Sequence, residues 1–216
     1  MKTALIITAL LFGFTAFAVS MLLKHAKPEA PAEPMPTRDK LVRAHSPAQG
    51  DASAPVVIVE FLDPACGTCR DFHPMVKTLL AEHPGKIKLV VRYAPFHQGA
   101  DRVVAMLHAA HLQRKFWPAL DALFNSHGEW VVAHRVDPER AWKVLSGAGL
   151  NMDQLAVDLS SPETAAVVQQ DLADASALQV AKTPAFFVNG RPLEPFGWEP
   201  LRKLVRDEVG RAVAQR

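Results

Sequence analysis

The chain of 216 residues contains only two cysteines, and they stand three positions apart in the run Cys66-Gly67-Thr68-Cys69. The pair follows the apolar, β-branched run 56–61, which predicts a strand buried on both faces. At the start of a helix, positions i and i+3 share one face with Cα atoms about 5–6 Å apart, the separation that a disulfide needs. Because no other cysteine exists, the pair indicates redox chemistry rather than a disulfide scaffold.

The strand–helix junction predicts different tasks for the two thiols. Cys66 would face the unpaired N–H groups and the positive dipole end of the helix, which stabilise a thiolate. We therefore expect Cys66 to be an exposed nucleophile with a lowered pKa. Cys69, one turn deeper, is expected to be the resolving thiol that closes the disulfide and expels a mixed-disulfide partner.

The overall composition limits the classes of function. Hydrophobic residues make up 49% of the chain and charged residues 21%, the balance of a globular protein with one domain and appendages. The formal net charge is only +2, and no basic tract is interleaved with aromatic residues, so we expect no nucleic-acid partner. The run 147–149 lacks the third glycine of a dinucleotide-binding loop, and we expect no cofactor.

The N-terminal segment from Thr3 to Leu23 carries no charged residue. As a helix it would span about 30 Å, the thickness of a bilayer's hydrocarbon core. Ala16-Phe17-Ala18 has the form of a signal-peptidase site, but the apolar run continues to Leu23, which favours an uncleaved membrane anchor. Cleavage near Ala18 remains the alternative. Residues 24–40, rich in Pro and Ala, predict an extended linker.

The order of elements predicts the fold class of the remaining domain, residues 41–213. The expected elements are an edge strand 41–44, strand 56–61, a helix from 66 towards 82 kinked at Pro74, strand 87–93, helices throughout 99–178, a hairpin 185–193 turning at Asn189-Gly190, and helix 198–213. Strand–helix–strand implies a right-handed parallel crossover, and the hairpin adds antiparallel strands. We therefore expect an α/β fold with a mixed central sheet and an inserted helical subdomain.

This layout resembles the thioredoxin fold, and more closely its DsbA-like branch with an inserted helical subdomain. The resemblance covers about residues 47–213 and depends on four features in register. They are the C-x-x-C run at a strand–helix junction, Pro74 in the following helix, the run 182–190 (KTPAFFVNG), and Glu60 six positions before Cys66. The resemblance implies a protein disulfide oxidoreductase with Cys66 and Cys69 as its catalytic pair.

The resemblance also implies roles for residues around the cysteines. Glu60 matches a buried acid of the family; strand alternation points it beneath the helix start, where a raised pKa would suit a proton relay to Cys69. A cis Pro184 would present the Thr183 backbone beside Cys66 for pairing with a substrate strand. Gly67 and Thr68 modulate the site, and strongly oxidising members usually carry histidine where this chain has Thr68.

The expected function is disulfide donation to exported, cysteine-containing proteins, with reoxidation by a membrane quinone-linked partner. Disulfide chemistry outside the cytoplasm predicts a single-pass protein of the bacterial inner membrane, anchored through residues 3–23 with its catalytic domain in the periplasm. A soluble periplasmic protein, cleaved near Ala18, is the alternative. Disulfide reductase or isomerase activity also stays open.

Another class of function remains possible from the sequence alone. Cys66 and Cys69 would suit a non-enzymatic Cu(I)-binding module, helped by Met35 or Met75. His108 and His111 stand three positions apart on a predicted helix, but the sequence shows no third ligand, so we predict no metal site there. His73 is expected at the surface, and residues 96–97 are expected on the active-site side of a strand end.

Overall fold

The computed structural model describes residues 38–214. The predicted anchor or signal segment at residues 3–23 lies outside the described residues, as does the predicted linker up to residue 37. The last residues assigned to the linker, 38–40, instead belong to helix α2 (Arg38–Leu41). None of the helices within residues 38–214 combines the length and the hydrophobicity of a membrane-spanning helix.

A five-stranded mixed sheet forms the centre of the domain, in the order β1-β3-β2-β6-β7. Its strands are β1 (Ala48–Gly50), β2 (Val56–Leu62), β3 (Ile87–Tyr93), β6 (Ala185–Val188) and β7 (Arg191–Pro192). Strands β2 and β3 are parallel, whereas β1–β3, β2–β6 and β6–β7 are antiparallel pairs. The predicted crossover, hairpin and mixed sheet are confirmed.

The predicted edge strand at residues 41–44 is wrong. Leu41 ends helix α2, and its buried side chain packs below the sheet with Val59 and Phe61. The edge strand is β1, which pairs with β3 through its backbone while its own side chains are exposed. Because the side chains of β1 are exposed and its pairing uses only main-chain bonds, its sequence shows no hydrophobic alternation that would predict a strand.

Gly50 in β1 occupies a position that only glycine fits. Its φ of 100° lies in the left-handed region that side chains disfavour. A Cβ at this position would also overlap the backbone carbonyl oxygen of Ile87 on the neighbouring strand. The residue therefore permits the close approach of β1 to β3.

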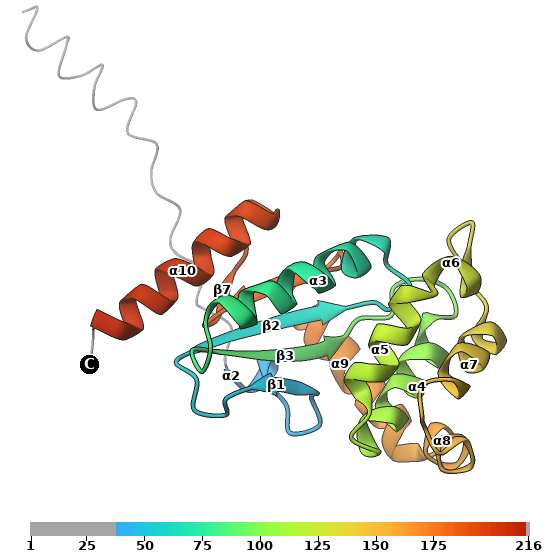
Figure 1. Cartoon of the computed structure of the whole chain (residues 1–216). Coiled ribbons are helices and arrows are strands. Elements are labelled where there is room, and N and C mark those ends of the chain that lie inside the picture. Colours follow the sequence, from blue (N-terminus) through green and yellow to red (C-terminus); the bar gives the residue numbers. More distant parts are fainter. Residues whose placement is uncertain (1–37, 215–216) are drawn as a thin grey trace, which may run out of the picture. The chain divides into compact units, whose positions relative to one another are not determined.

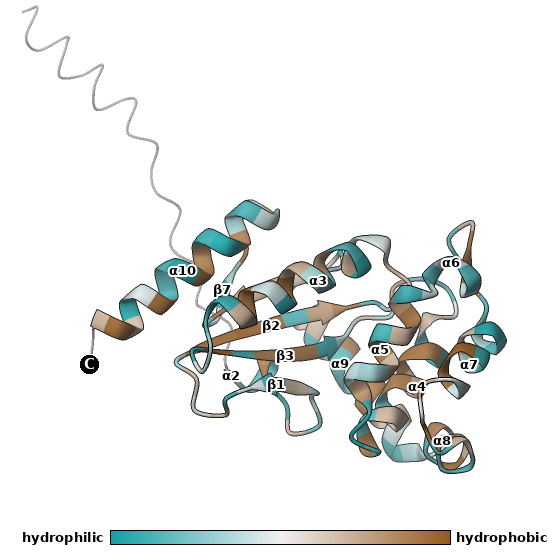
Figure 2. Ribbon diagram, viewed as in Figure 1, coloured by the Kyte–Doolittle hydropathy of each residue, from teal (hydrophilic) through white to brown (hydrophobic). Residues whose placement is uncertain are grey.

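Helices cover both faces of the sheet (Figure 1). Helix α3 (Gly67–Glu82) and helix α10 (Trp198–Ala214) pack on the face that carries Ile58 and Leu89. Helix α2 and helix α9 (Pro162–Ala177) contribute to the apolar cluster on the other face. Strands β2 and β3 are hydrophobic along most of their length, and α10 alternates between hydrophobic and hydrophilic stretches, as Figure 2 shows.

The helical subdomain lies between β3 and β6 in the chain, as predicted. Its helices are α4 (Ala100–Leu112), α5 (Phe116–Asn125), α6 (His127–Trp130), α7 (Pro138–Ser146), α8 (Met152–Leu159) and α9. The region is not helical throughout, because β4 (Val131–Val132) and β5 (Arg135–Val136) form a small hairpin. Ala133 and His134 form its turn with positive φ angles of 49° and 62°. The residue types Ala and His do not by themselves predict this conformation.

A buried ionic cluster joins the lower helices to the sheet. The guanidinium of Arg92 on β3 is fully buried and bonds Asp171 and Asp174 on α9, with nitrogen–oxygen distances of 2.7 Å to each. Arg92 also donates to the backbone carbonyl of Lys40, and Arg43 forms a two-pronged pair with Asp174 at 2.8 Å. The cluster therefore fixes the segment after α2 against α9.

Candidate active site

The cysteine pair begins the helix that follows β2. Cys66 is the N-cap residue of α3, with an extended φ of −79° and ψ of 119°. Its backbone N–H donates to the Asp63 carbonyl at 3.0 Å, and its carbonyl accepts from Arg70 at 3.1 Å. The Cys66 sulfur therefore lies at the N-terminal end of α3, where the first helix amides are located.

Both cysteines belong to the apolar cluster that fills the helical subdomain. They share this cluster with Leu62 and Tyr93 from the sheet and with side chains of α4, α5 and α7. Cys66 retains only 7% of its exposure, so the prediction of an exposed nucleophile is wrong in degree. Apolar side chains of the helical subdomain and the Thr183 carbonyl lie against Cys66 and leave little of the residue exposed.

The Cys66 thiol is strongly acidified. The Cys66 Sγ lies 3.2 Å from the Thr183 carbonyl oxygen, to which the protonated thiol donates. The pKa of Cys66 is lowered to about 5, chiefly by a hydrogen bond from the Cys69 thiol. Burial opposes this shift. The Thr183 hydroxyl and the backbone amides of Cys69 and Thr68 contribute further hydrogen bonds that lower the pKa. Cys66 is therefore a thiolate at neutral pH.

The Cys69 thiol behaves in the opposite way. It is completely buried, and burial raises its pKa well above the ordinary value of 9.0. Its hydrogen bond to Cys66 and the nearby Glu60 carboxyl raise the pKa further. The two cysteines are present as free thiols, so the structure describes the reduced pair.

Glu60 on β2 lies beneath this pair as strand alternation predicted. Its side chain is 2% exposed, and its Oε1 atom has no hydrogen-bond partner among the described residues. Burial and, to a smaller extent, the charge of Cys66 together raise the pKa of Glu60 to about 8. The carboxyl therefore holds a proton at neutral pH, within electrostatic reach of both sulfurs.

The remaining predicted site residues surround Cys66. The Thr183–Pro184 peptide bond is cis, Pro184 is buried, and β6 begins at the next residue. Thr68 is exposed and acts on Cys66 through its backbone amide. A Cβ at Gly67 would point into open space, so this position leaves the approach to the pair open.

Asp63 is a site residue that the sequence interpretation did not single out. Its buried carboxylate accepts from the Ala65 amide, from both amides of residues 96–97, and from His97 Nδ1, all at 2.8 Å. Asp63 therefore ties the active-site turn to the loop after β3. Phe96 and His97 do lie on this side of the sheet, and the Phe96 side chain is 42% exposed.

His127 was also missed. It begins α6 in the helical subdomain, and its Nε2 lies 3.0 Å from the carbonyl oxygen of Ala65, the residue before Cys66. The contact joins residues 62 positions apart, and a lone histidine between predicted helices gave no sequence signal for it.

Comparison with known proteins identifies the family of this chain. The family described as Thioredoxin matches residues 43–207, which include the strand, the cysteine pair, the helical subdomain and the cis-proline segment. The chain belongs to the thioredoxin family. Its described part has a thioredoxin-like α/β fold with a mixed sheet and a helical insertion.

Two curated relatives differ in how much of their length this thioredoxin-family chain spans. The chain is 31% identical over 145 residues to the Na+/H+ antiporter NhaA of Herminiimonas arsenicoxydans, covering 67% of this chain but only 22% of the antiporter. It is 28% identical over 173 residues to the probable disulfide bond formation protein D of Bacillus anthracis, covering 74% of this chain and 76% of that protein.

Solved structures agree with the fold. A thioredoxin-like oxidoreductase from Silicibacter pomeroyi is 27% identical, with a TM-score of 0.70 over 83% of this chain and 99% of the other. The alpha-DsbA1 protein of Wolbachia pipientis has a TM-score of 0.71 over 81% of this chain and 96% of the other. At 18% identity this second likeness concerns the fold alone.

Other histidines singled out from the sequence make no hydrogen bond to either cysteine within the described residues. The His108 ring lies edge-on to His45, with centroids 6.4 Å apart, and is tilted against His111, with centroids 6.0 Å apart. Within residues 38–214, no three His, Cys, Asp or Glu side chains are arranged to hold a metal ion. His73 is buried rather than at the surface, because its Nε2 pairs with Asp121 of α5 at 2.6 Å.

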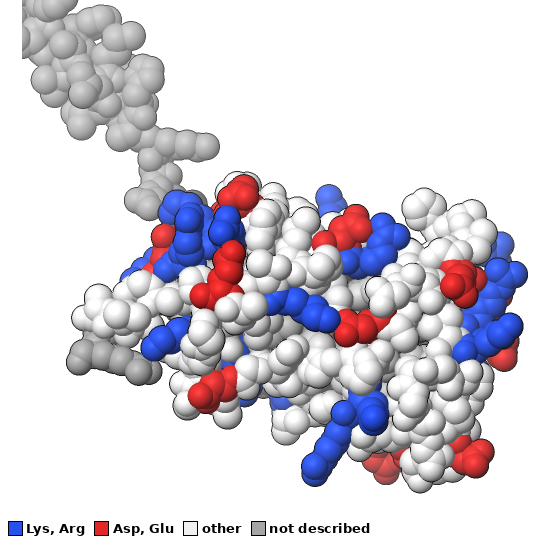
Figure 3. Space-filling model, viewed as in Figure 1, with Lys and Arg blue, Asp and Glu red and all other residues white. Residues whose placement is uncertain are grey.

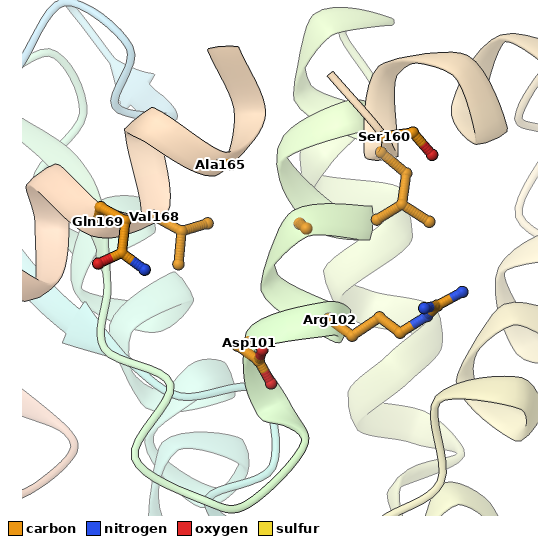
Figure 4. A pocket seen from close by; sticks show the side chains of 8 residues that line it. Asp101, Arg102, Ser160, Ala165, Val168 and Gln169 are labelled. Carbon is orange, nitrogen blue, oxygen red and sulfur yellow. The ribbon is translucent and has the colours of Figure 1, made fainter. Parts of the chain in front are cut away.

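A cavity of about 430 Å³ opens between α4, α8 and α9 (Figure 4). Val168 and Gln169 of α9 lie on one side of α4 in Figure 4, and the Arg102 side chain extends to the other side, below Ser160. No residue of the cysteine site lines this cavity. On the face drawn in Figure 3, Lys and Arg side chains are interspersed with Asp and Glu side chains.

Proposed function

We propose that this protein is a thiol–disulfide oxidoreductase that donates the Cys66–Cys69 disulfide to cysteine-containing proteins. The observation that carries the proposal is the separation of the two thiol pKa values, to about 5 for Cys66 and well above 9.0 for Cys69. Thiolate stabilisation at Cys66 favours the reduced pair, and a stable reduced form makes the disulfide an oxidant.

The reaction begins with attack by a client thiolate on the Cys66 sulfur. The Cys66–Cys69 bond breaks, Cys69 leaves with the electron pair, and a mixed disulfide joins the client to Cys66. A second client thiolate then attacks the client sulfur of this mixed disulfide, and Cys66 leaves as a thiolate. The client loses two electrons, and the enzyme pair gains them. Because Cys66 has the lower pKa, it is the better leaving group in the second step.

Glu60 supplies the proton that Cys69 needs. Cys69 leaves as a thiolate in a fully buried position, where an unneutralised charge is costly. The protonated Glu60 carboxyl, with a pKa of about 8, lies close enough to affect the pKa of Cys69. Proton transfer from Glu60 to Cys69 therefore neutralises the leaving thiolate, and the reverse transfer activates Cys69 when the pair is reoxidised.

The Thr183 segment is the proposed docking strand for the client backbone. The Thr183 carbonyl already contacts the Cys66 sulfur at 3.2 Å, so an extended client segment placed there would bring its own cysteine to Cys66. Main-chain pairing of this kind tolerates many sequences, which suits an enzyme with varied clients.

We place this activity in an oxidising compartment, with the bacterial periplasm as the proposed location and exported proteins as the clients. The uncharged segment 3–23 supports a membrane anchor or export signal, and a membrane redox partner would accept the two electrons of the reduced pair.

Equilibration with glutathione tests the direction of electron flow. We expect the Cys66–Cys69 reduction potential to lie clearly above about −270 mV, the value typical of thioredoxin. A potential near that value would contradict the donor assignment, and insulin reduction and refolding of a scrambled substrate would then distinguish a reductase from an isomerase.

Trapping variants test the division of labour between the two cysteines. Cys69→Ser should accumulate a mixed disulfide between Cys66 and a client, because no resolving thiol remains. Cys66→Ser should form no such adduct and should lose turnover. Retained turnover in Cys66→Ser would contradict the nucleophile assignment.

A further inference from the structure

The peptide bond that precedes the nucleophile is held at both of its ends. Its N–H group, on Cys66, donates to the Asp63 carbonyl at 3.0 Å. Its carbonyl oxygen, on Ala65, lies 3.0 Å from Nε2 of His127. The first contact is local, whereas the second comes from the helical subdomain. An imidazole thus reaches the active-site turn from an element that the cysteine motif does not include.

The donor in this contact must be the histidine. A carbonyl oxygen only accepts hydrogen bonds, so Nε2 of His127 carries the hydrogen. Ala65 is 2% exposed, so solvent has little access to replace that donor. The His127 ring also packs edge-on against Trp130, with centroids 5.6 Å apart. Trp130 is fully buried, and its indole N–H bonds the Leu123 carbonyl at 2.9 Å.

We propose that His127 is a positioning residue that makes the Cys66–Cys69 disulfide more oxidising by neutralising the carbonyl dipole beside Cys66. The inference rests on the proposed function. The Ala65 carbonyl belongs to the peptide bond that precedes Cys66, and its negative end disfavours a thiolate at Cys66. The N–H group of His127 offsets that negative end, in the same sense as the amides of Thr68 and Cys69.

The effect acts on one redox state. Two-electron reduction of the disulfide leaves Cys66 as a thiolate and Cys69 as a protonated thiol. Only the reduced state has a negative charge on Cys66 for the His127 bond to stabilise. His127 therefore raises the reduction potential, whereas a purely structural contact would stabilise both redox states equally and leave the potential unchanged.

Donor-free and donor-retaining variants separate these two roles. His127→Phe keeps a ring against Trp130 but removes the N–H donor, whereas His127→Gln keeps an N–H donor. For His127→Phe we expect the equilibrium constant against glutathione to fall about two- to tenfold, the range of one neutral hydrogen bond. This change corresponds to a potential about 10–30 mV lower. His127→Gln should stay close to the wild type.

The matched control is His134→Asn in the same subdomain. His134 is exposed and has a φ of 62°, a conformation that Asn tolerates. This variant should leave the potential at the wild-type value. An unchanged potential in His127→Phe, or an equal loss in His127→Phe and His127→Gln, would overturn the role of the His127 donor.

Nuclear magnetic resonance of the wild type gives a second test that does not depend on folding of a variant. The imidazole signals of His127 should show an inflection near the Cys66 pKa of about 5 in the reduced protein and lack it in the oxidised protein. Identical titration curves in the two states would contradict the inference. If the wild-type pair fails to exchange with glutathione at all, the proposed function itself fails; a normal potential unaffected by His127→Phe refutes only this inference.

Discussion

Buried carboxyl groups lie on both sides of the central sheet, and their surroundings shift their pKa values in opposite directions. Below the sheet, Asp171 and Asp174 bond Arg92, and salt bridges lower the pKa of Asp174 to about 2 despite its burial. Above it, Glu60 lacks a hydrogen-bond partner for Oε1 among the described residues, and burial raises its pKa to about 8.

This difference separates a structural role from a chemical one. The paired carboxylates stay ionised and connect α9 to β3, so their charges support the fold. The unpaired carboxyl stays protonated beside two sulfurs, so its proton is available for transfer. A buried acid without a partner reduces stability, and its presence next to the cysteines indicates function.

Arg92→Met should have the largest effect on stability. The variant leaves two carboxylates buried without their shared partner, and losing one member of a buried ion pair costs about 3–5 kcal/mol. Urea unfolding of the oxidised protein measures the loss. Glu60→Gln is the matched change on the other face, and we expect it to leave the free energy of unfolding unchanged or higher, since no ion pair is broken. Equal losses in the two variants would refute the comparison.

The pH dependence of stability should differ between the redox states. The folded pKa of Glu60, about 8, exceeds its ordinary value of 4.5, so the folded state binds the extra proton between these values. Burial alone keeps this pKa raised in the oxidised protein, where Cys66 has no charge, so its stability should fall as pH rises above about 4.5, by up to about 1.4 kcal/mol per pH unit. Glu60→Gln should abolish that decline.

Reduction should oppose this decline. The folded pKa of Cys66, about 5, lies below its ordinary value of 9.0, so thiolate formation adds stability as pH rises between these values. The reduced protein should therefore have a flatter profile between pH 5 and 8 than the oxidised protein. Urea titrations of both states at several pH values measure the two slopes, and parallel slopes would contradict the pKa assignments.

Below pH 4 the paired carboxylates should dominate in both redox states. The folded pKa of Asp174, about 2, lies below its ordinary value of 3.8, so its contribution is present above 3.8 and is lost as pH falls towards 2. Asp174→Asn should weaken this acid limb without changing the profile between pH 5 and 8. A change in the neutral range instead would show that the two faces are coupled.

Thr183→Val should give the smallest effect. The variant removes the hydroxyl that lowers the pKa of Cys66 but retains the backbone carbonyl at the sulfur. We expect the pKa of Cys66 to rise by up to about one unit, the scale of one hydrogen bond. The pH dependence of alkylation by iodoacetamide measures this shift. An unchanged profile would limit Thr183 to its backbone role.

Local patterns predicted the part of the site that lies within one strand and one helix. The β-branched run 56–61 and the spacing of Cys66 and Cys69 predicted that the pair begins a helix. Alternation along the strand predicted that Glu60 lies beneath that helix start. Resemblance to a family added the cis bond before Pro184. These features depend on neighbours in the sequence or on a shared motif, which is why the sequence revealed them.

Contacts between distant segments could not be predicted in this way. The Asp63 carboxylate meets residues 96–97, and His127 meets Ala65, only after the sheet and the helical subdomain have packed together. Strand β1 lacks a hydrophobic pattern because its side chains are exposed, and the turn at residues 133–134 depends on backbone angles that the residue types do not specify. Long-range packing therefore determines these elements.

The most direct test is a titration of the reduced protein followed by thiolate absorbance at 240 nm, with the oxidised protein as the baseline. The ionisation of Cys66 should produce the absorbance of one thiolate with a midpoint near pH 5, while Cys69 stays protonated beyond pH 9. A midpoint near the ordinary value of 9.0, or two thiolates that appear together, would contradict the division of roles between Cys66 and Cys69.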